Sequence, residues 1–305
     1  MELLALHPSV PFRWCWVTRQ GSDRFTRDAK VQGFKSRAAF KLLELDAKYK
    51  IFKKGQTVVD LGYAPGSWTQ QVAVERTRPH GRVLGIDIIP AVPPKGASTI
   101  QGNFLSPSVQ ADVRAFLSDP DRGRPRPDSV FASRDDAPLT EAELEARDRG
   151  YIDLERHADL KEVDEEGGGK GKEAARGRTV DVVLSDMCDP WPQTTGFYKR
   201  SLTDPYLRMA NTSGTPFRDH AASMDLCLAA LRFCTTTLRT GGHFVCKYYA
   251  GGEDKALETQ FRRLFARVSR EKPAASRSES REAYFVGVKR KADVGLEEVF
   301  PGGER

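Results

Sequence analysis

Residues Val58 to Trp68 read Val-Val-Asp-Leu-Gly-Tyr-Ala-Pro-Gly-Ser-Trp, an apolar run that ends near an acidic residue and then breaks into a turn. The apolar first half is typical of a central parallel strand that is covered on both faces. Gly62, Pro65 and Gly66 predict a turn in which the backbone approaches a ligand closely. The stretch therefore predicts a buried strand that leads into a binding loop.

A second strand is predicted about twenty residues later, where Arg82-Val-Leu-Gly-Ile-Asp87 ends in a carboxylate that can accept hydrogen bonds from a ribose diol. Further strands and helices are expected to alternate along the chain. This pattern predicts an α/β fold with a Rossmann-like, doubly wound, mostly parallel sheet. The expected strands are 180–186, 243–249 and 281–288, and the expected helices are 36–50, 220–238 and 257–267.

The two predicted strands outline a Rossmann-like pocket for an adenosyl ligand. The turn after the first strand indicates which adenosyl ligand is bound. A dinucleotide site needs G-x-G-x-x-G at this turn, and a P-loop needs Gly-Lys-Ser/Thr, but neither is present. The sequence from Ala64 and Pro65 to Trp68 suits a ligand without phosphates, and we expect S-adenosylmethionine. The alternative is that Asp60-Leu-Gly is an ordinary strand end followed by a turn.

Length and composition allow one α/β domain with insertions or two small domains in 305 residues. No apolar stretch approaches the ~18 to 20 residues that a membrane span needs, so we expect no membrane partner. The five cysteines lack C-x-x-C spacing, which predicts neither a disulfide framework nor a zinc site. A reducing compartment is the simplest inference.

Charge is unevenly distributed along the chain. Residues 119–178 contain 17 acidic and 12 basic residues, whereas the rest of the chain carries a net charge of +11. A basic body favours a polyanionic partner, nucleic acid first. The acidic stretch is rich in proline at its start and in glycine at its end, which predicts a poorly ordered insertion. We expect a basic and aromatic leader (1–32), a single domain (33–290) with this insertion, and a charged tail (291–305).

Several polar residues are predicted to meet at one edge of the sheet, because ligands of open parallel sheets bind outside the carboxyl ends of the strands. Asp186 follows one predicted strand, and Lys247 lies late in the next. Lys41 comes from the helix before the sheet, and Glu282 comes from the start of the last strand. Two lysines and two carboxylates are thus expected beside the ligand, although Lys247 could instead extend to solvent from a strand edge.

Six segments in the same order and spacing resemble the motif series of the FtsJ-type ribosomal RNA ribose 2′-O-methyltransferases, most closely the mitochondrial large-subunit branch. The resemblance covers about residues 33 to 290 apart from two insertions. The segments are Lys35-Ser-Arg-Ala-Ala-Phe-Lys-Leu, Asp60-Leu-Gly-Tyr-Ala-Pro-Gly-Ser-Trp, Gly85-Ile-Asp, Val182-Val-Leu-Ser-Asp-Met, Phe244-Val-Cys-Lys and Ser280-Arg-Glu-Ala-Tyr.

The resemblance implies a catalytic Lys-Asp-Lys-Glu tetrad, which maps onto Lys41, Asp186, Lys247 and Glu282. It also implies a methyl-donor pocket. The residues expected to line that pocket are Gly62, Ala64, Pro65, Gly66, Trp68, Asp87, Asn103 and Asp186. The family usually has an acid where this chain has Asn103, so the adenine contact expected there would be made by an amide.

A ribose 2′-hydroxyl is a very weak acid, so its attack on the sulfonium methyl needs a base. We expect Lys247 to be that base, with its pKa lowered by burial and by Lys41, and with Asp186 and Glu282 orienting the groups. No metal is expected, because the leaving group is neutral and no phosphate is transferred.

Basic residues before the first helix predict RNA contacts, with a solvated helix face as the alternative. The residues expected to bind RNA are Arg27, Lys30, Lys35 and Arg37. By resemblance the partner is ribosomal RNA or a precursor of the large ribosomal subunit, the location is the mitochondrion, and a monomer is expected. Three alternatives stay open: an RNA-binding ribosome assembly factor, a methyltransferase of tRNA or cytosolic rRNA, and a nicotinamide-dependent oxidoreductase, which the missing glycine fingerprint disfavours.

Overall fold

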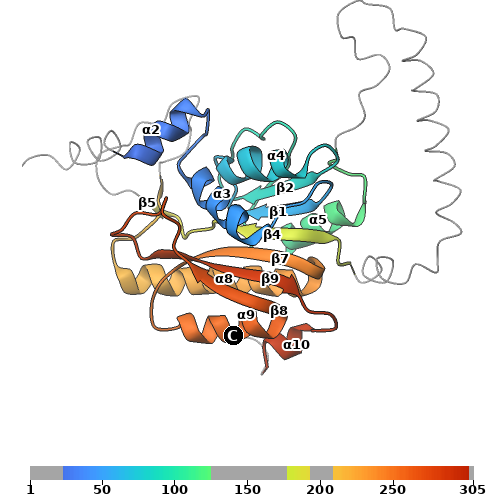
Figure 1. Cartoon of the computed structure of the whole chain (residues 1–305). Helices are drawn as coiled ribbons and strands as arrows, with labels where there is room; N and C mark the ends of the chain where they lie inside the picture. The colour runs from blue at the N-terminus through green and yellow to red at the C-terminus, as the bar shows by residue number, and fades with distance from the viewer. Residues whose placement is uncertain (1–22, 125–176, 193–208, 302–305) are drawn as a thin grey trace, which may run out of the picture.

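A computed structural model describes residues 23–124, 177–192 and 209–301 (Figure 1). Most of the predicted leader, most of the acidic insertion and the middle of the loop after Asp186 therefore lie outside the described residues. The predictions for those segments stay predictions.

A seven-stranded, mostly parallel sheet forms the centre of the described part of the chain. Its strands are β1 (Thr57–Leu61), β2 (Arg82–Asp87), β3 (Ser98–Gln101), β4 (Val180–Ser185), β7 (Leu238–Tyr249), β8 (Phe265–Glu271) and β9 (Glu282–Arg290). The spatial order is β3-β2-β1-β4-β7-β9-β8, and β9 alone runs antiparallel to both of its neighbours. The strand order reverses between β1 and β4, which is where ligands bind in such sheets.

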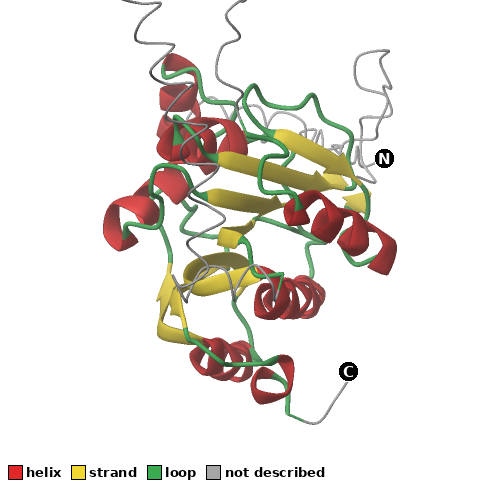
Figure 2. Ribbon diagram, turned by 90° about the vertical axis from the view of Figure 1, so that its right-hand side faces the viewer, coloured by secondary structure: helices red, strands yellow, loops and turns green. Residues whose placement is uncertain are grey.

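Helices cover both faces of the sheet, as Figure 2 shows. The helical segments are α2 (Arg24–Val31), α3 (Ala38–Tyr49), the π-helical η1 (Thr69–Val74), α4 (Glu75–Thr77), α5 (Pro107–Ser118), α8 (Pro216–Thr237), α9 (Asp254–Leu264) and α10 (Leu296–Val299). One buried cluster joins α5, α8, α9 and α10 to one face of the sheet, and a second joins α3 and η1 to the other face. The doubly wound α/β prediction is confirmed.

Neighbouring residues of β1 supply both cores. Val58 belongs to the cluster under α3, whereas Val59 and Leu61 belong to the cluster under α5 and α8, and all three are fully buried. Successive side chains of a strand point to opposite faces, so a continuous apolar run is required when both faces are covered. The predicted central strand is confirmed for this reason.

Two predicted boundaries differ from the structure. The helix expected to end at Leu238 ends at Thr237, and β7 already begins at Leu238 rather than near residue 243. Gly241 and Gly242, interpreted as the end of that helix, lie instead in an irregularity of β7, where the pairing register with β4 shifts and Gly241 has φ +80°. Glycine supplies the positive φ that this bulge requires.

The start of the predicted insertion is part of the folded body. Arg82 is 1% exposed, and its guanidinium donates hydrogen bonds to the carbonyls of Asp119 and Leu117. Arg124 donates to the carbonyl of Gly55 at 3.2 Å. These bonds satisfy buried donors that would otherwise be costly, so residues 119–124 are anchored to the sheet.

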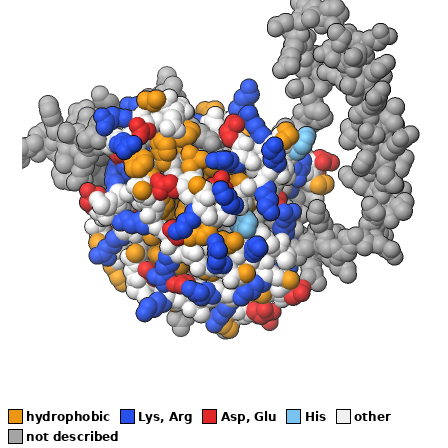
Figure 3. All heavy atoms as spheres, in the orientation of Figure 1, with side chains coloured by type: hydrophobic (Ala, Val, Ile, Leu, Met, Phe, Trp, Pro, Cys, Tyr) orange, Lys and Arg blue, Asp and Glu red, His pale blue; other side chains and the backbone are white. Residues whose placement is uncertain are grey.

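Lys and Arg side chains are spread over the face seen in Figure 3, where they are more numerous than the acidic side chains. Among the described residues, no helix is long and apolar enough to cross a membrane.

Candidate active site

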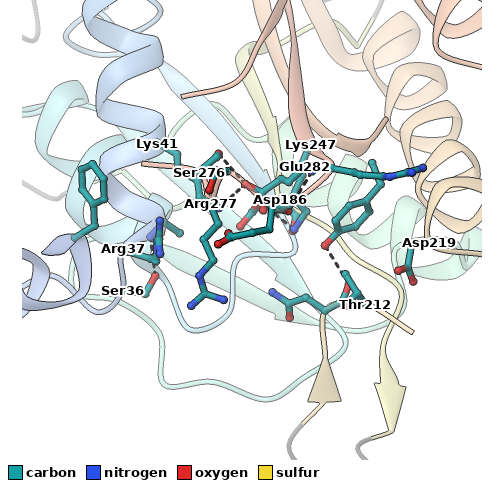
Figure 4. Close-up of a pocket in the computed structure, with 18 of the residues that line it drawn as sticks. Ser36, Arg37, Lys41, Asp186, Thr212, Asp219, Lys247, Ser276, Arg277 and Glu282 are labelled. Atoms are coloured by element: carbon teal, nitrogen blue, oxygen red, sulfur yellow. Dashed lines mark hydrogen bonds and ion pairs between the residues drawn. The ribbon is translucent and has the colours of Figure 1, made fainter. Parts of the chain in front are cut away.

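The four residues of the predicted tetrad reach one place from four elements. Asp186 directly follows β4, Lys247 lies near the carboxyl end of β7, and Lys41 lies in α3. Glu282 is the first residue of β9. Because β9 runs antiparallel to β7, its start lies at the same edge as the carboxyl ends of the parallel strands. The predicted convergence is therefore present (Figure 4).

Lys247 is held by Asp186. Its Nζ donates to the backbone carbonyl oxygen of Asp186 at 2.6 Å and lies 3.1 Å from Oδ1 of the same residue. The Lys247 side chain is 3% exposed, whereas that of Asp186 is 24% exposed. The alternative that Lys247 extends to solvent is not met, because the ammonium turns inward to Asp186.

Glu282 organises the other half of the tetrad. Its Oε1 accepts from Nζ of Lys41 at 2.5 Å and from the hydroxyls of Ser276 and Tyr284, each at 3.1 Å. The ring of Tyr284 is fully buried and packs against that of Trp68, with centroids 5.8 Å apart. Three donors to a single oxygen fix the carboxylate firmly and orient Lys41 beside the cavity.

The charges of the site shift two pKa values. Burial disfavours the protonated form of Lys247, but the Asp186 carboxylate outweighs that effect and raises the pKa of Lys247 above its usual value. This direction is opposite to the lowering expected from the sequence. Burial also disfavours ionised Glu282, yet the neighbouring ammonium groups of Lys41 and Lys247 hold the pKa of Glu282 below its usual value. With its pKa lowered, Glu282 is ionised at neutral pH.

Two cavities meet at the tetrad. One has a volume of about 930 Å³ and is lined by residues of α3, of the loop 272–281 and of the segment 211–219. The other has a volume of about 560 Å³ and lies over the carboxyl ends of β1, β2 and β4. Among the described residues, those that line both cavities are Asp186, Asn211 and Lys247. Lys41 and Glu282 line the larger cavity, part of which Figure 4 shows.

The smaller cavity contains most residues predicted to bind the methyl donor. The predicted residues that line it are Gly62, Ala64, Pro65, Asp87, Asn103 and Asp186. Gly62 has φ +77°, and a Cβ at this position would lie 2.9 Å from Cα of Met187, so the turn requires glycine. Asp87 is fixed by the backbone NH groups of Ala64 and Ile89, each 2.9 Å from one of its carboxylate oxygens.

Gly66 and Trp68 line neither cavity. Trp68 is 3% exposed, and its indole NH donates to the carbonyl of Ala38 at the start of α3 at 2.8 Å. The indole therefore joins the binding turn to the helix that carries Lys41. This placement differs from the one expected from the sequence, which could not show to which side the ring turns.

The smaller cavity fits S-adenosylmethionine better than a nucleotide with phosphates. Apolar side chains, including Ile88, Phe104 and Leu105, offer a surface for an adenine ring, and Asp87 offers a carboxylate for a ribose diol. Lys247 is the one Lys or Arg among its described lining residues, and Asp186 already pairs with it. In the part of the chain that the structure describes, no group of three or more His, Cys, Asp and Glu residues could hold a metal ion.

Comparison with known proteins agrees with these features. A sequence profile of the FtsJ-like methyltransferases matches residues 34–290. The chain is 40% identical to the mitochondrial rRNA methyltransferase 2 of Saccharomyces cerevisiae over 300 residues, which cover 93% of this chain and 90% of the yeast protein. The chain belongs to the FtsJ-like methyltransferase family.

Two more relatives of this FtsJ-like methyltransferase are informative. Ribosomal RNA large subunit methyltransferase E of Zymomonas mobilis is 31% identical over 89% of this chain and 86% of its own length. The crystal structure of a Plasmodium falciparum protein described as a ribosomal RNA methyltransferase has a TM-score of 0.53 and 23% identity, over 84% of this chain and 98% of that chain. The structural likeness supports the fold.

The four residues predicted to bind RNA have different environments in this FtsJ-like methyltransferase. Arg27 and Lys30 are exposed on α2. Lys35 is exposed, but its ammonium donates to the carbonyl of Pro65 at 2.9 Å. Arg37 forms an ion pair with Asp23 and donates to a carbonyl of the loop 272–281. Arg37 thus has a structural role in joining α2 to the rim of the larger cavity.

Other lining residues of the larger cavity escaped the sequence analysis. Arg277 and Arg281 are exposed on the loop before β9, and Tyr249 lies two residues after Lys247 on the same face of β7. The period of two along a strand is a signal that could have identified Tyr249. Nothing in the sequence places the loop 272–281 beside α2, because that contact depends on the reversed direction of β9.

Proposed function

We propose that this protein is an S-adenosylmethionine-dependent methyltransferase of a ribose 2′-hydroxyl in ribosomal RNA, most specifically the large-subunit rRNA of mitochondria. The observation that carries the proposal is the convergence of Lys41, Asp186, Lys247 and Glu282 where a nucleoside-sized cavity meets a larger one. The names of the yeast and bacterial relatives, which mention rRNA, the large subunit and the mitochondrion, support the choice of substrate and location.

In this proposal the smaller cavity binds the methyl donor and the larger one binds the target nucleotide. S-adenosylmethionine, when bound, supplies an electrophilic methyl group on a positively charged sulfur. Lys247 accepts the proton of the 2′-hydroxyl after its own ammonium has lost a proton to solvent, and Asp186 holds the amine in place at 2.6 to 3.1 Å. The positive charge of the bound donor disfavours the protonated form of Lys247. It therefore opposes the effect of the Asp186 carboxylate, which raises the pKa of Lys247. Glu282 holds Lys41 at the wall of the larger cavity, where the proposal places the ribose 2′-oxygen.

RNA binding is proposed to involve the loop 272–281 at the larger cavity and the neighbouring helix α2. Arg277 and Arg281 line the cavity, whereas Arg27 and Lys30 on α2 lie outside it. All four side chains are exposed and able to contact phosphates. The proposed substrate is ribosomal RNA or a precursor of the large subunit, and the protein is proposed to act as a monomer.

The test is transfer of a labelled methyl group from S-adenosylmethionine to total RNA and to mitochondrial large-subunit RNA, followed by mapping of alkali-resistant ribose positions. Lys247→Ala should bind the donor but lose turnover by about 10²- to 10⁴-fold, the usual contribution of a general base. Lys54→Ala, which removes an exposed lysine, is the control and should keep its activity. Donor binding without ribose methylation of RNA or of ribosomal particles would instead favour an assembly factor.

A further inference from the structure

The junction of the two cavities is formed by one acidic, one basic and one neutral side chain. Asp186 and Lys247 are the charged pair already assigned to the proposed proton transfer. Asn211 is the third residue that lines both cavities. In the proposed reaction the methyl group crosses this junction, so a side chain that lines both cavities is placed to contact the acceptor.

A pair of short strands positions Asn211 at the junction of the two cavities. Two short strands, β5 (Trp191–Pro192) and β6 (Met209–Ala210), pair antiparallel. The first begins five residues after Asp186, and the second ends directly before Asn211. The pairing therefore returns the chain to the junction after the segment 193–208.

Tyr249 fixes the backbone at Asn211. Its hydroxyl donates to the carbonyl of Asn211 at 3.1 Å, and its side chain is buried in the wall of the larger cavity. Tyr249 is itself held by α8: its NH donates to the hydroxyl of Ser223 at 3.1 Å, and Nδ1 of His220 donates to its carbonyl at 2.7 Å. These contacts fix the backbone from which the Asn211 side chain extends.

The chemistry of an amide suits this place. The Asn211 side chain is exposed toward solvent, and within the described residues it makes no hydrogen bond that would occupy it. An amide both donates and accepts, as a sugar hydroxyl does. It also carries no charge, so it leaves the ion pair between Asp186 and Lys247 undisturbed, whereas a third charged group would attract one partner and repel the other.

We propose that the side-chain amide of Asn211 hydrogen-bonds the ribose edge of the target nucleotide and holds its 2′-oxygen in line with the methyl group. This inference rests on the proposed ribose methylation. Asn211 is therefore a positioning residue for the acceptor and contributes little to the affinity for the methyl donor. The neighbouring Thr212 and Tyr249 line the larger cavity alone, which supports the assignment to the acceptor side.

The experiment compares Asn211→Ala and Asn211→Asp with Gln260→Ala, a control that removes an amide on α9, away from both cavities. Single-turnover methylation of the RNA is measured at saturating donor, and the donor Kd is measured by calorimetry without RNA. Asn211→Ala should slow the single-turnover rate by roughly 10- to 100-fold, since misalignment by about 1 Å costs that much, and should leave the donor Kd within about twofold. Gln260→Ala should have little effect on the single-turnover rate or on the donor Kd.

Two further variants separate alignment from folding. Tyr249→Phe removes the hydroxyl that holds the Asn211 carbonyl and should cause a smaller loss of rate in the same direction. Asn211→Asp keeps the shape but adds a negative charge, and its loss should depend on pH. An unchanged single-turnover rate in Asn211→Ala, or a loss confined to donor affinity, would overturn the inference. Absence of ribose methylation by the unaltered protein would instead refute the proposed function on which the inference depends.

Discussion

The pH dependence of stability can be predicted from Asp60, the acid in the middle of the binding motif. Asp60 is fully buried at the end of β1 and lines neither cavity. Its Oδ2 accepts from the hydroxyl of Thr69 at 2.5 Å, whereas Oδ1 has no hydrogen-bond partner among the described residues. Burial raises the pKa of Asp60 to about 8, against the effect of the Thr69 hydrogen bond. We therefore expect the carboxyl to be mostly protonated at neutral pH.

The sign of the effect follows from proton binding. Between the unfolded pKa of 3.8 and the folded pKa of about 8, the native state holds a proton on Asp60 that the unfolded state has lost. The contribution of protonated Asp60 to the free energy of unfolding is complete below the unfolded pKa. It falls by about 1.4 kcal/mol per pH unit as the pH rises from the unfolded pKa through the folded pKa. Between about pH 5 and about pH 7 this amounts to roughly 3 kcal/mol.

The perturbation is Asp60→Asn, which keeps the shape and the acceptor for Thr69 but cannot ionise. The assay is denaturant unfolding of both proteins across this pH range. The free energy of unfolding of the native protein should fall relative to that of the variant by the amount given, because all other titrating groups cancel in the difference. Asp112→Asn, on the exposed surface of α5, is the control for the same change of formal charge. Parallel curves for the native protein and Asp60→Asn would refute the reasoning.

Three other perturbations test the site. Gly62→Ala should weaken donor binding and lower the unfolding free energy by about 1–3 kcal/mol, because φ is +77° and the new Cβ would collide with Met187; an unchanged donor Kd in calorimetry would contradict this. Lys30→Ala should reduce the slope of log RNA affinity against log salt concentration by about 1. Arg37→Ala should mainly reduce thermal stability, because its guanidinium is already paired with Asp23. Equal slopes for the two variants in filter binding over a salt series would contradict this distinction. Trp68→Phe should cost about 1 kcal/mol in denaturant unfolding through the lost indole hydrogen bond, with the donor Kd unchanged; a large loss of donor affinity would argue for an indole that reaches the pocket.

Strands and catalytic residues were predictable where a physical rule links them to sequence. β1, β2 and β4 were predictable because strands buried on both faces need continuous apolar residues. β3 was missed because its four residues, Ser98–Gln101, contain one apolar side chain and are mostly half-buried, so they form no continuous apolar run. The positions of Asp186 and Lys247 followed from the rule that the carboxyl ends of parallel strands share one edge.

The remaining errors have local causes. The helix predicted to reach Arg267 ends at Leu264, and β8 begins at the next residue, Phe265. No glycine or proline separates the two elements, and both Leu264 and Phe265 are buried, so the apolar pattern continues through the boundary. The pKa direction of Lys247 was wrong because it depends on the close approach of Asp186, which sequence spacing alone does not give.

The reversed strand β9 supplies one residue of the tetrad, Glu282, late in the synthesis of the chain. Every described residue that lines the smaller cavity precedes residue 248, so that pocket can assemble before the last strand has emerged from the ribosome. The partner of Lys41, Glu282, is synthesised 241 residues later. Because chains fold from the N-terminus during synthesis, the wall of the smaller cavity is synthesised first, and the pairing of Lys41 with Glu282 is among the last contacts of the tetrad to form.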